Sequence, residues 1–173
     1  MAKEDFSVVL GVTYPAGGPF TELQGTLNDG DAFLNWVTDP DGGNVPVANV
    51  TTVGLPGSTF GTDQQSMEDA FADLVRRANS GNEWHGRLFI FASGHGFSTE
   101  KNSIETGFVA SNSTVDKWRY LPVHGYADFF SLSGMFDSVF LFLDCCRTKQ
   151  TDYPISETGL RHGSQQFRND PTK

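Results

Sequence analysis

The sequence is short of cysteine, of positive charge and of long apolar runs, and each shortage excludes a class of protein. It holds two cysteines, Cys145 and Cys146, and because they are adjacent they do not make the disulfide framework of a small secreted domain. No apolar stretch reaches the roughly 18–20 residues that a membrane-spanning helix needs. Hydrophobic residues nevertheless make up 38% of the 173, enough for a packed core and too many for a disordered chain. The length suits one domain.

Positive charge is scarce, because 12 Lys and Arg stand against 21 Asp and Glu and give a net charge of −9. The longest basic run is Arg76-Arg77. Binding to nucleic acid or to an anionic membrane surface needs clustered Lys and Arg, so neither partner is expected. Residues 1–5 carry both signs of charge and lead into a strand pattern, unlike a signal peptide. Together with the cysteine count, these features predict a cytoplasmic protein.

Short apolar segments alternate with segments of helical spacing along the chain. The apolar segments that predict strands are Phe6–Val12, Asn49–Leu55, Arg87–Ala92 and Ser138–Leu143. Helical spacing predicts helices over 27–37, 66–78 and, interrupted by Ser and Gly, 126–135. This alternation predicts an α/β fold with a mostly parallel sheet and helices on both faces.

The segments around these elements are rich in capping and turn residues. For the first helix we expect Asn28 or Asp29 as the N-cap. In the second helix, Ser66 with Asp69 comes close to a capping box. Residues 97–120 are polar, with a short hairpin strand expected at 107–110. Residues 148–173 are polar and turn-rich, and no strand is expected there.

Two of the predicted strands end in residues with reactive side chains. The third ends in Ser93-Gly94-His95-Gly96, and the fourth ends in Asp144-Cys145-Cys146-Arg147. Reactive groups of parallel sheets lie at the carboxyl ends of strands. If these two strands are neighbours, His95 and Cys146 therefore face each other across one crevice. A thiolate is a nucleophile, and an imidazole can support its ionisation and then protonate a leaving amine, so the pair predicts thiol-protease chemistry.

These motifs resemble those of the caspase and metacaspase clan of cysteine peptidases, and the likeness covers nearly the whole chain. The residues that carry it are Leu88–Gly96, Val139–Arg147 and Leu27-Asn28-Asp29. His95 stands about 50 residues before Cys146, which is the spacing of the caspase pair. The resemblance implies a caspase-like three-layer fold and the activity of a cysteine endopeptidase.

The resemblance also implies the catalytic roles. His95 and Cys146 would form the dyad, since the clan places its nucleophile where Cys146 stands, directly before Arg147. Cys145 would pack against its neighbours, although it remains the alternative nucleophile. The backbone N–H groups of Gly96 and Cys146 would form the oxyanion hole, where negative charge develops during acyl transfer.

A specificity pocket for a basic side chain follows from the same resemblance. Asp144 stands two positions before the nucleophile, where caspases that cut after Asp carry Gln and metacaspases carry an acid. Asp29 matches the other acid of the metacaspase pocket, and Ser93 matches a polar residue of it. Two carboxylates attract a guanidinium or ammonium group, so we expect cleavage after Arg or Lys. The purely structural alternatives are that Asp29 caps the first helix and that Asp144 bonds a loop.

The fourth predicted strand is continuously apolar, so we expect it in the centre of a sheet, yet no strand is expected after it. In the caspase clan a C-terminal small subunit supplies further strands, and the resemblance implies the same partner here. Residues 1–147 would then be the catalytic large subunit and residues 148–173 an intersubunit linker or tail. The predicted pocket accepts Lys173, so we expect a processing site there, with an arbitrary chain end as the alternative.

No metal or cofactor motif stands out in the sequence. Adjacent cysteines lack the spacing of zinc sites. The resemblance to metacaspases raises a requirement for calcium, but no dense acidic run like an EF-hand loop accompanies it, and the question stays open. By family analogy, the expected role is in cell death or immune defence. The alternative function is that of a pseudo-protease, a caspase-like interaction module without turnover.

Overall fold

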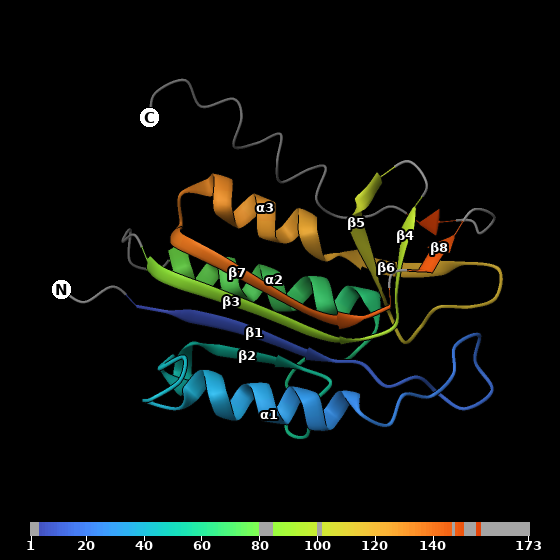
Figure 1. Ribbon diagram of the computed structural model, residues 1–173, viewed down its shortest axis with the longest axis horizontal. Coiled ribbons are helices and arrows are strands. Elements are labelled where there is room, and N and C mark those ends of the chain that lie inside the picture. Colours follow the sequence, from blue (N-terminus) through green and yellow to red (C-terminus); the bar gives the residue numbers. More distant parts are fainter. Residues whose placement is uncertain (1–3, 80–84, 100–101, 147, 151–154, 157–173) are drawn as a thin grey trace.

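Four parallel strands form the central sheet of the computed structural model, which describes residues 4–79, 85–99, 102–146, 148–150 and 155–156 (Figure 1). The strands are β1 (Phe6–Gly11), β2 (Val50–Val53), β3 (His85–Gly94) and β7 (Phe136–Cys145). They lie in the order β2-β1-β3-β7, and every neighbouring pair is parallel. The predicted α/β fold with a parallel sheet is therefore confirmed.

Helices cover both faces of this sheet. The helix α1 (Thr26–Thr38) lies on one face, while α2 (Gln64–Ala78) and α3 (Val123–Ser133) lie on the other (Figure 1). Successive side chains of a strand point to opposite faces, so a strand covered on both sides is apolar throughout. In β3, Ile90 packs into the core under α2 and α3, whereas Phe91 stacks on Phe33 of α1 with ring centroids 4.5 Å apart. Within the described residues, no helix has the length and apolar character to cross a membrane.

A second, smaller sheet stands beyond the carboxyl ends of β3 and β7. Its strands, in order, are β8 (Thr148–Gln150), β4 (Gly96–Thr99), β5 (Asn102–Val109), β6 (Trp118–Pro122) and β9 (Ile155–Ser156). The sequence indicates only a short part of β5, and the expectation of no strand after residue 147 is wrong. The strand β8 has three residues and pairs in parallel with β4, and β9 has two residues and pairs in parallel with β6. Strands this short contain no apolar alternation that a sequence pattern could reveal.

The N-cap predictions for both helices are wrong. The N-cap of α1 is Gly25, which makes no side-chain cap hydrogen bond, and the helix runs on through Asp29. The N-cap of α2 is Asp63, whose carboxylate accepts hydrogen bonds from the Ser66 backbone N–H at 3.1 Å and from its hydroxyl at 2.5 Å. These bonds, the hydroxyl bond first, hold the pKa of Asp63 below its usual value. The predicted capping box fails because Ser66 is the partner of the cap rather than the cap itself.

The strand β7 has one strand neighbour, β3, among the described residues, and so forms an edge of the central sheet. Val139, Leu141 and Leu143 pack against the core beneath α3. On the opposite face Phe140 and Phe142 remain 42% and 40% exposed. The expectation that this strand is buried on both faces is therefore wrong for the described residues.

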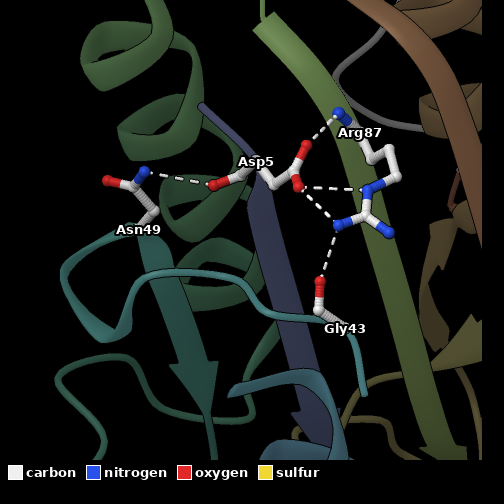
Figure 2. Close-up of polar contacts among 4 residues, drawn as sticks. All are labelled: Asp5, Gly43, Asn49 and Arg87. Atoms are coloured by element: carbon white, nitrogen blue, oxygen red, sulfur yellow. Dashed lines mark hydrogen bonds and ion pairs between the residues drawn. The ribbon is translucent and has the colours of Figure 1, made fainter. Parts of the chain in front are cut away.

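A polar cluster ties the amino ends of β1 and β3 together (Figure 2). The Asp5 carboxylate accepts from the Arg87 backbone N–H at 2.6 Å and from the guanidinium at 2.6 and 3.0 Å. The guanidinium also donates to the Gly43 carbonyl at 2.7 Å, and the Asn49 amide donates to the Asp5 carbonyl at 3.1 Å. This cluster joins both strands to the segment between α1 and β2.

Replacing Arg87 with methionine is expected to lower the free energy of unfolding by about 2 kcal/mol, because the Asp5 carboxylate, 16% exposed, loses charge-assisted bonds. Arg87→Lys should keep only part of this free energy, since an ammonium group cannot donate two parallel hydrogen bonds to a carboxylate. The matched control is Arg76→Met, which removes an ion pair with a 73% exposed guanidinium and should cost well under about 1 kcal/mol. Equal urea midpoints for the Arg87 and Arg76 variants would contradict this role.

Candidate active site

The loops that follow β1 and β3 diverge at the carboxyl edge of the central sheet. From β1 the chain passes through α1 to β2 on one side, whereas from β3 it goes on to β7 on the other side. A strand order of 2-1-3 creates a topological switch point between the first and third strands, and open α/β sheets bind ligands in the crevice there. His95 follows β3 at this position, opposite the residues that follow β1.

Both ends of His95 are held by hydrogen bonds. Its backbone N–H donates to the hydroxyl of Tyr14 at 2.9 Å, and its carbonyl accepts from the N–H of Val109 at 2.9 Å. Nε2 of the ring lies 2.8 Å from the carbonyl oxygen of Thr21. A carbonyl can only accept, so Nε2 carries the hydrogen and, in the neutral ring, Nδ1 is the nitrogen left free to take a proton.

Aromatic rings fix the plane of the His95 imidazole. The ring centroids of Tyr14 and Phe20 lie 4.6 and 5.3 Å from that of His95. Phe20 is held in turn by an edge-to-face contact with Trp118 at 4.8 Å. His95 nevertheless stays partly exposed, so the imidazole can be reached from solvent.

The register between β3 and β7 places the two predicted catalytic residues at one end of neighbouring strands. Ser93 is paired with Asp144 and Gly94 with Cys145, so His95 and Cys146 are the next residues along the two parallel strands. The sequence could state this only as a condition, which the observed pairing fulfils.

Gly96 touches the segment that carries both cysteines. A Cβ atom added to Gly96 would lie 2.7 Å from Sγ of Cys145 and 2.7 Å from the carbonyl oxygen of Cys146, closer than such contacts occur. A side chain at position 96 would therefore push the two loops apart. The backbones of the two residues predicted to supply oxyanion N–H groups, Gly96 and Cys146, lie against one another.

The two cysteines differ in their surroundings. Neither forms a disulfide, but Cys145 is half-buried and packs against the main core, whereas Cys146 is exposed. Only an exposed thiol can be reached by a substrate carbonyl carbon. The contrast favours Cys146 as the nucleophile and gives Cys145 the packing role expected of it.

The three residues predicted to form the specificity pocket lie on the α1 face of the sheet. The Ser93 hydroxyl donates to Oδ2 of Asp29 at 3.3 Å, and Ser93 itself is 1% exposed. Asp144 alternates with Phe142, whose ring lies 5.3 Å from Phe33 of α1, and so it shares their face.

Within the described part of the chain, neither Asp29 nor Asp144 has the purely structural role that the sequence offered as its alternative. Asp29 is not the N-cap of α1, and Ser93 is the donor that the structure gives it. Asp144 is exposed, and its carboxylate bonds no loop among the residues that the structure describes. The predicted processing site Lys173, and Arg147 beside the nucleophile, lie outside the described residues.

Sequence reasoning missed the residues that hold His95, which are Tyr14, Phe20 and Thr21. Thr21 acts through its carbonyl oxygen, which every residue type possesses, so no sequence signal could single it out. Tyr14 carries a weak signal as an aromatic residue with a polar tip directly after a buried strand. In the described part of the chain, no three His, Cys, Asp or Glu side chains gather in a way that could hold a metal ion.

No model of a known protein family matches this chain, and no curated protein matches it at a significant level. The functional interpretation therefore depends on the chain's own residues and on their geometry.

Proposed function

We propose that this chain is the larger part of a caspase-like or metacaspase-like cysteine endopeptidase that cleaves after Arg or Lys. The observation that carries the proposal is the pairing of β3 with β7, which brings His95 and the exposed Cys146 to the same end of adjacent strands. The tautomer set by Thr21 supports it, because Nδ1 of His95 is left to act as the base.

In the proposed reaction, Nδ1 of His95 takes the thiol proton and the Cys146 thiolate attacks the carbonyl carbon of the scissile bond. The tetrahedral intermediate collapses as His95 returns the proton to the leaving amine, and a thioester to Cys146 remains. Water then attacks the thioester with His95 again as the base. The acid product leaves and the thiol is restored.

Negative charge on the substrate oxygen needs hydrogen-bond donors at both tetrahedral stages. The backbone N–H groups of Gly96 and Cys146 are suited to this role, since their backbones already lie in contact. Fixed backbone donors need no reorganisation when the charge develops, which makes such stabilisation large. The absence of a side chain at position 96 lets the loop after β3 lie this close to the segment that carries Cys146.

A basic P1 side chain suits the acidic α1 face of the site. Asp29 is held by Ser93 from β3, while Asp144 stands exposed at the end of β7. A guanidinium or ammonium group that enters between them would be paired with carboxylate on two sides. A P1 aspartate would meet like charge there, which costs binding energy.

The exposed edge of β7 supports the further proposal of a partner that completes the sheet, such as the small subunit of the caspase clan. Among the described residues this ten-residue strand has β3 as its one strand neighbour, and its other edge, beside exposed Phe140 and Phe142, forms a template for another strand. Helix α1 packs mainly on β1 and β3 and reaches β7 through ring contacts of Phe33 and Trp36 with Phe142, which still leave Phe142 40% exposed. A covering strand and helix would bury both phenylalanines next to the catalytic end of β7.

Fluorogenic peptides that differ only at P1 test the proposal on the full-length protein. We expect Arg and Lys peptides to be hydrolysed, with kcat/KM at least about 100-fold above that of the Asp peptide, because each like-charge contact costs several kcal/mol. A chloromethyl ketone with P1 Arg should label Cys146, as peptide mass spectrometry would reveal. Preferential cleavage of the Asp peptide would refute the pocket, and an accessible but unreactive Cys146 would identify a pseudo-protease.

A further inference from the structure

The hydrogen bonds between His95 and Val109 differ from those of a regular antiparallel pair. Gly96 is paired with Phe108, so His95 and Val109 are the next pair of the same ladder. In a hydrogen-bonded pair of this kind the two residues exchange two direct N–H···O bonds. Here one is direct, from Val109 N–H to the His95 carbonyl at 2.9 Å.

The second bond of the pair passes through the side chain of Tyr14. The N–H of His95 donates to the Tyr14 hydroxyl at 2.9 Å, and that hydroxyl donates to the carbonyl of Val109 at 2.9 Å. The Tyr14 oxygen is thus inserted into the ladder at the residue where β3 gives way to β4. It holds the two backbones apart while satisfying both polar groups.

Tyr14 is well suited to stay in this position. It is 4% exposed, and its ring packs against the imidazole of His95 and against Phe20. Burial raises the pKa of Tyr14 well above its ordinary value, so the hydroxyl keeps its hydrogen and remains a donor to Val109. Burial also means that the side chain does not reach a substrate.

The loop after β1 therefore makes hydrogen bonds to His95 at two points. Tyr14 fixes the backbone N–H, and Thr21, seven positions later in the same loop, fixes Nε2 at the far end of the side chain. With both ends held and the ring packed against the rings of Tyr14 and Phe20, the imidazole has one direction left for Nδ1. The bond from Nε2 to Thr21 would have to break for the ring to turn, and the bond from Tyr14 would have to break for the backbone that carries the ring to shift.

We propose that Tyr14 is a positioning residue for the His95 base, and that its inserted hydroxyl sets the direction in which Nδ1 faces the thiol of Cys146. This inference rests on the proposed function, and it adds a residue that acts on the reaction without touching the substrate. Tyr14→Phe keeps the ring but leaves the N–H of His95 and the carbonyl of Val109 unpaired. The base should then move from its aligned position, which slows proton transfer but not substrate binding.

The test compares Tyr14→Phe with Tyr126→Phe, which removes a hydroxyl from another buried tyrosine, 8% exposed and stacked on Phe71 of α2. We expect Tyr14→Phe to lower kcat for an Arg peptide about 10- to 100-fold, the size of effect that a 1 Å displacement causes. KM should stay within about twofold, because Tyr14 makes no substrate contact. Tyr126→Phe should keep both constants. An unchanged kcat in Tyr14→Phe, with an active wild type, would overturn the positioning role and leave the protease proposal standing.

A second variant and a second measurement separate positioning from stability. Gly94→Ala removes no hydrogen-bonding group, but its methyl would lie 3.2 Å from the Tyr14 hydroxyl and 2.9 Å from the ring of Phe108, and it should reproduce the loss in kcat. Hydrogen exchange at the His95 amide should quicken at least about tenfold in Tyr14→Phe and not in Tyr126→Phe. This readout needs no activity. If the wild type hydrolysed nothing, the proposed function would fail, while unchanged exchange would overturn the hold of Tyr14 on His95.

Discussion

Under the proposed function, Cys146→Ala is expected to lower kcat for a peptide with Arg at P1 by at least about 10⁴-fold, the scale on which loss of the nucleophile acts in serine proteases. The alanine has no group that can form the thioester. Its Cβ lies where the wild-type Cβ lies, on an exposed residue beyond the end of β7, so folding should be untouched. Initial rates over a range of peptide concentrations, with thermal unfolding measured alongside, check both expectations.

Cys145→Ala is the matched control for this substitution. It removes a half-buried thiol that packs against the core, so a small loss of stability is expected, with kcat within about threefold of the wild type. The reverse result, activity lost in Cys145→Ala and kept in Cys146→Ala, would make Cys145 the nucleophile. Activity retained by both variants would exclude a thiol mechanism.

Asp144→Asn is expected to lower kcat/KM for the Arg peptide about 10- to 100-fold, and Asp29→Asn should do the same, because each removes one carboxylate that would pair with the P1 cation. Asparagine keeps the size of the side chain and can still accept from Ser93, so the change is one of charge. For a peptide with Gln at P1, kcat/KM should fall little in either variant. The ratio of kcat/KM for Arg to that for Gln is therefore the quantity to measure.

Asp31→Asn provides the control for net charge. Asp31 is exposed on α1, two positions beyond Asp29 and hence on another side of the helix. Its loss changes the total charge by the same amount but should leave the Arg to Gln ratio within about twofold. An equal fall of the Arg to Gln ratio in Asp144→Asn, Asp29→Asn and Asp31→Asn would mean that the overall negative charge of the protein, and not a pocket, attracts the basic peptide.

The central sheet could be predicted from the sequence because most of its strands form largely apolar runs, of which β1 and β3 are covered on both faces. A short continuous apolar run such as 88–92 indicates a buried strand, and the sequences of α1 and α2 carry apolar stripes of helical spacing. The small sheet escaped prediction for the opposite reason. Strands of two to four residues such as β4, β8 and β9 are defined by backbone pairing with distant partners, which local patterns do not record.

The candidate site divides along a similar line. His95, Cys146, Asp29 and Asp144 are proposed from chemistry that their side chains alone can perform, so residue type and position make them visible. The support for His95 comes from a carbonyl oxygen, at Thr21, and from a hydroxyl inserted in a ladder, from Tyr14. The sequence gives no signal for the first and only a weak one for the second, since both contacts depend on the path of a loop rich in Gly and Pro.

The pairing of β3 with β7 also fixes when this site can exist during synthesis. A ribosome that adds about 5–20 residues per second delivers the histidine segment several seconds before the cysteine segment, roughly 50 residues later. Until the last strand emerges and docks on β3, the nascent polypeptide has a base without a thiol partner. If His95 and Cys146 act together as proposed, hydrolysis therefore has to wait until β7 has paired with β3.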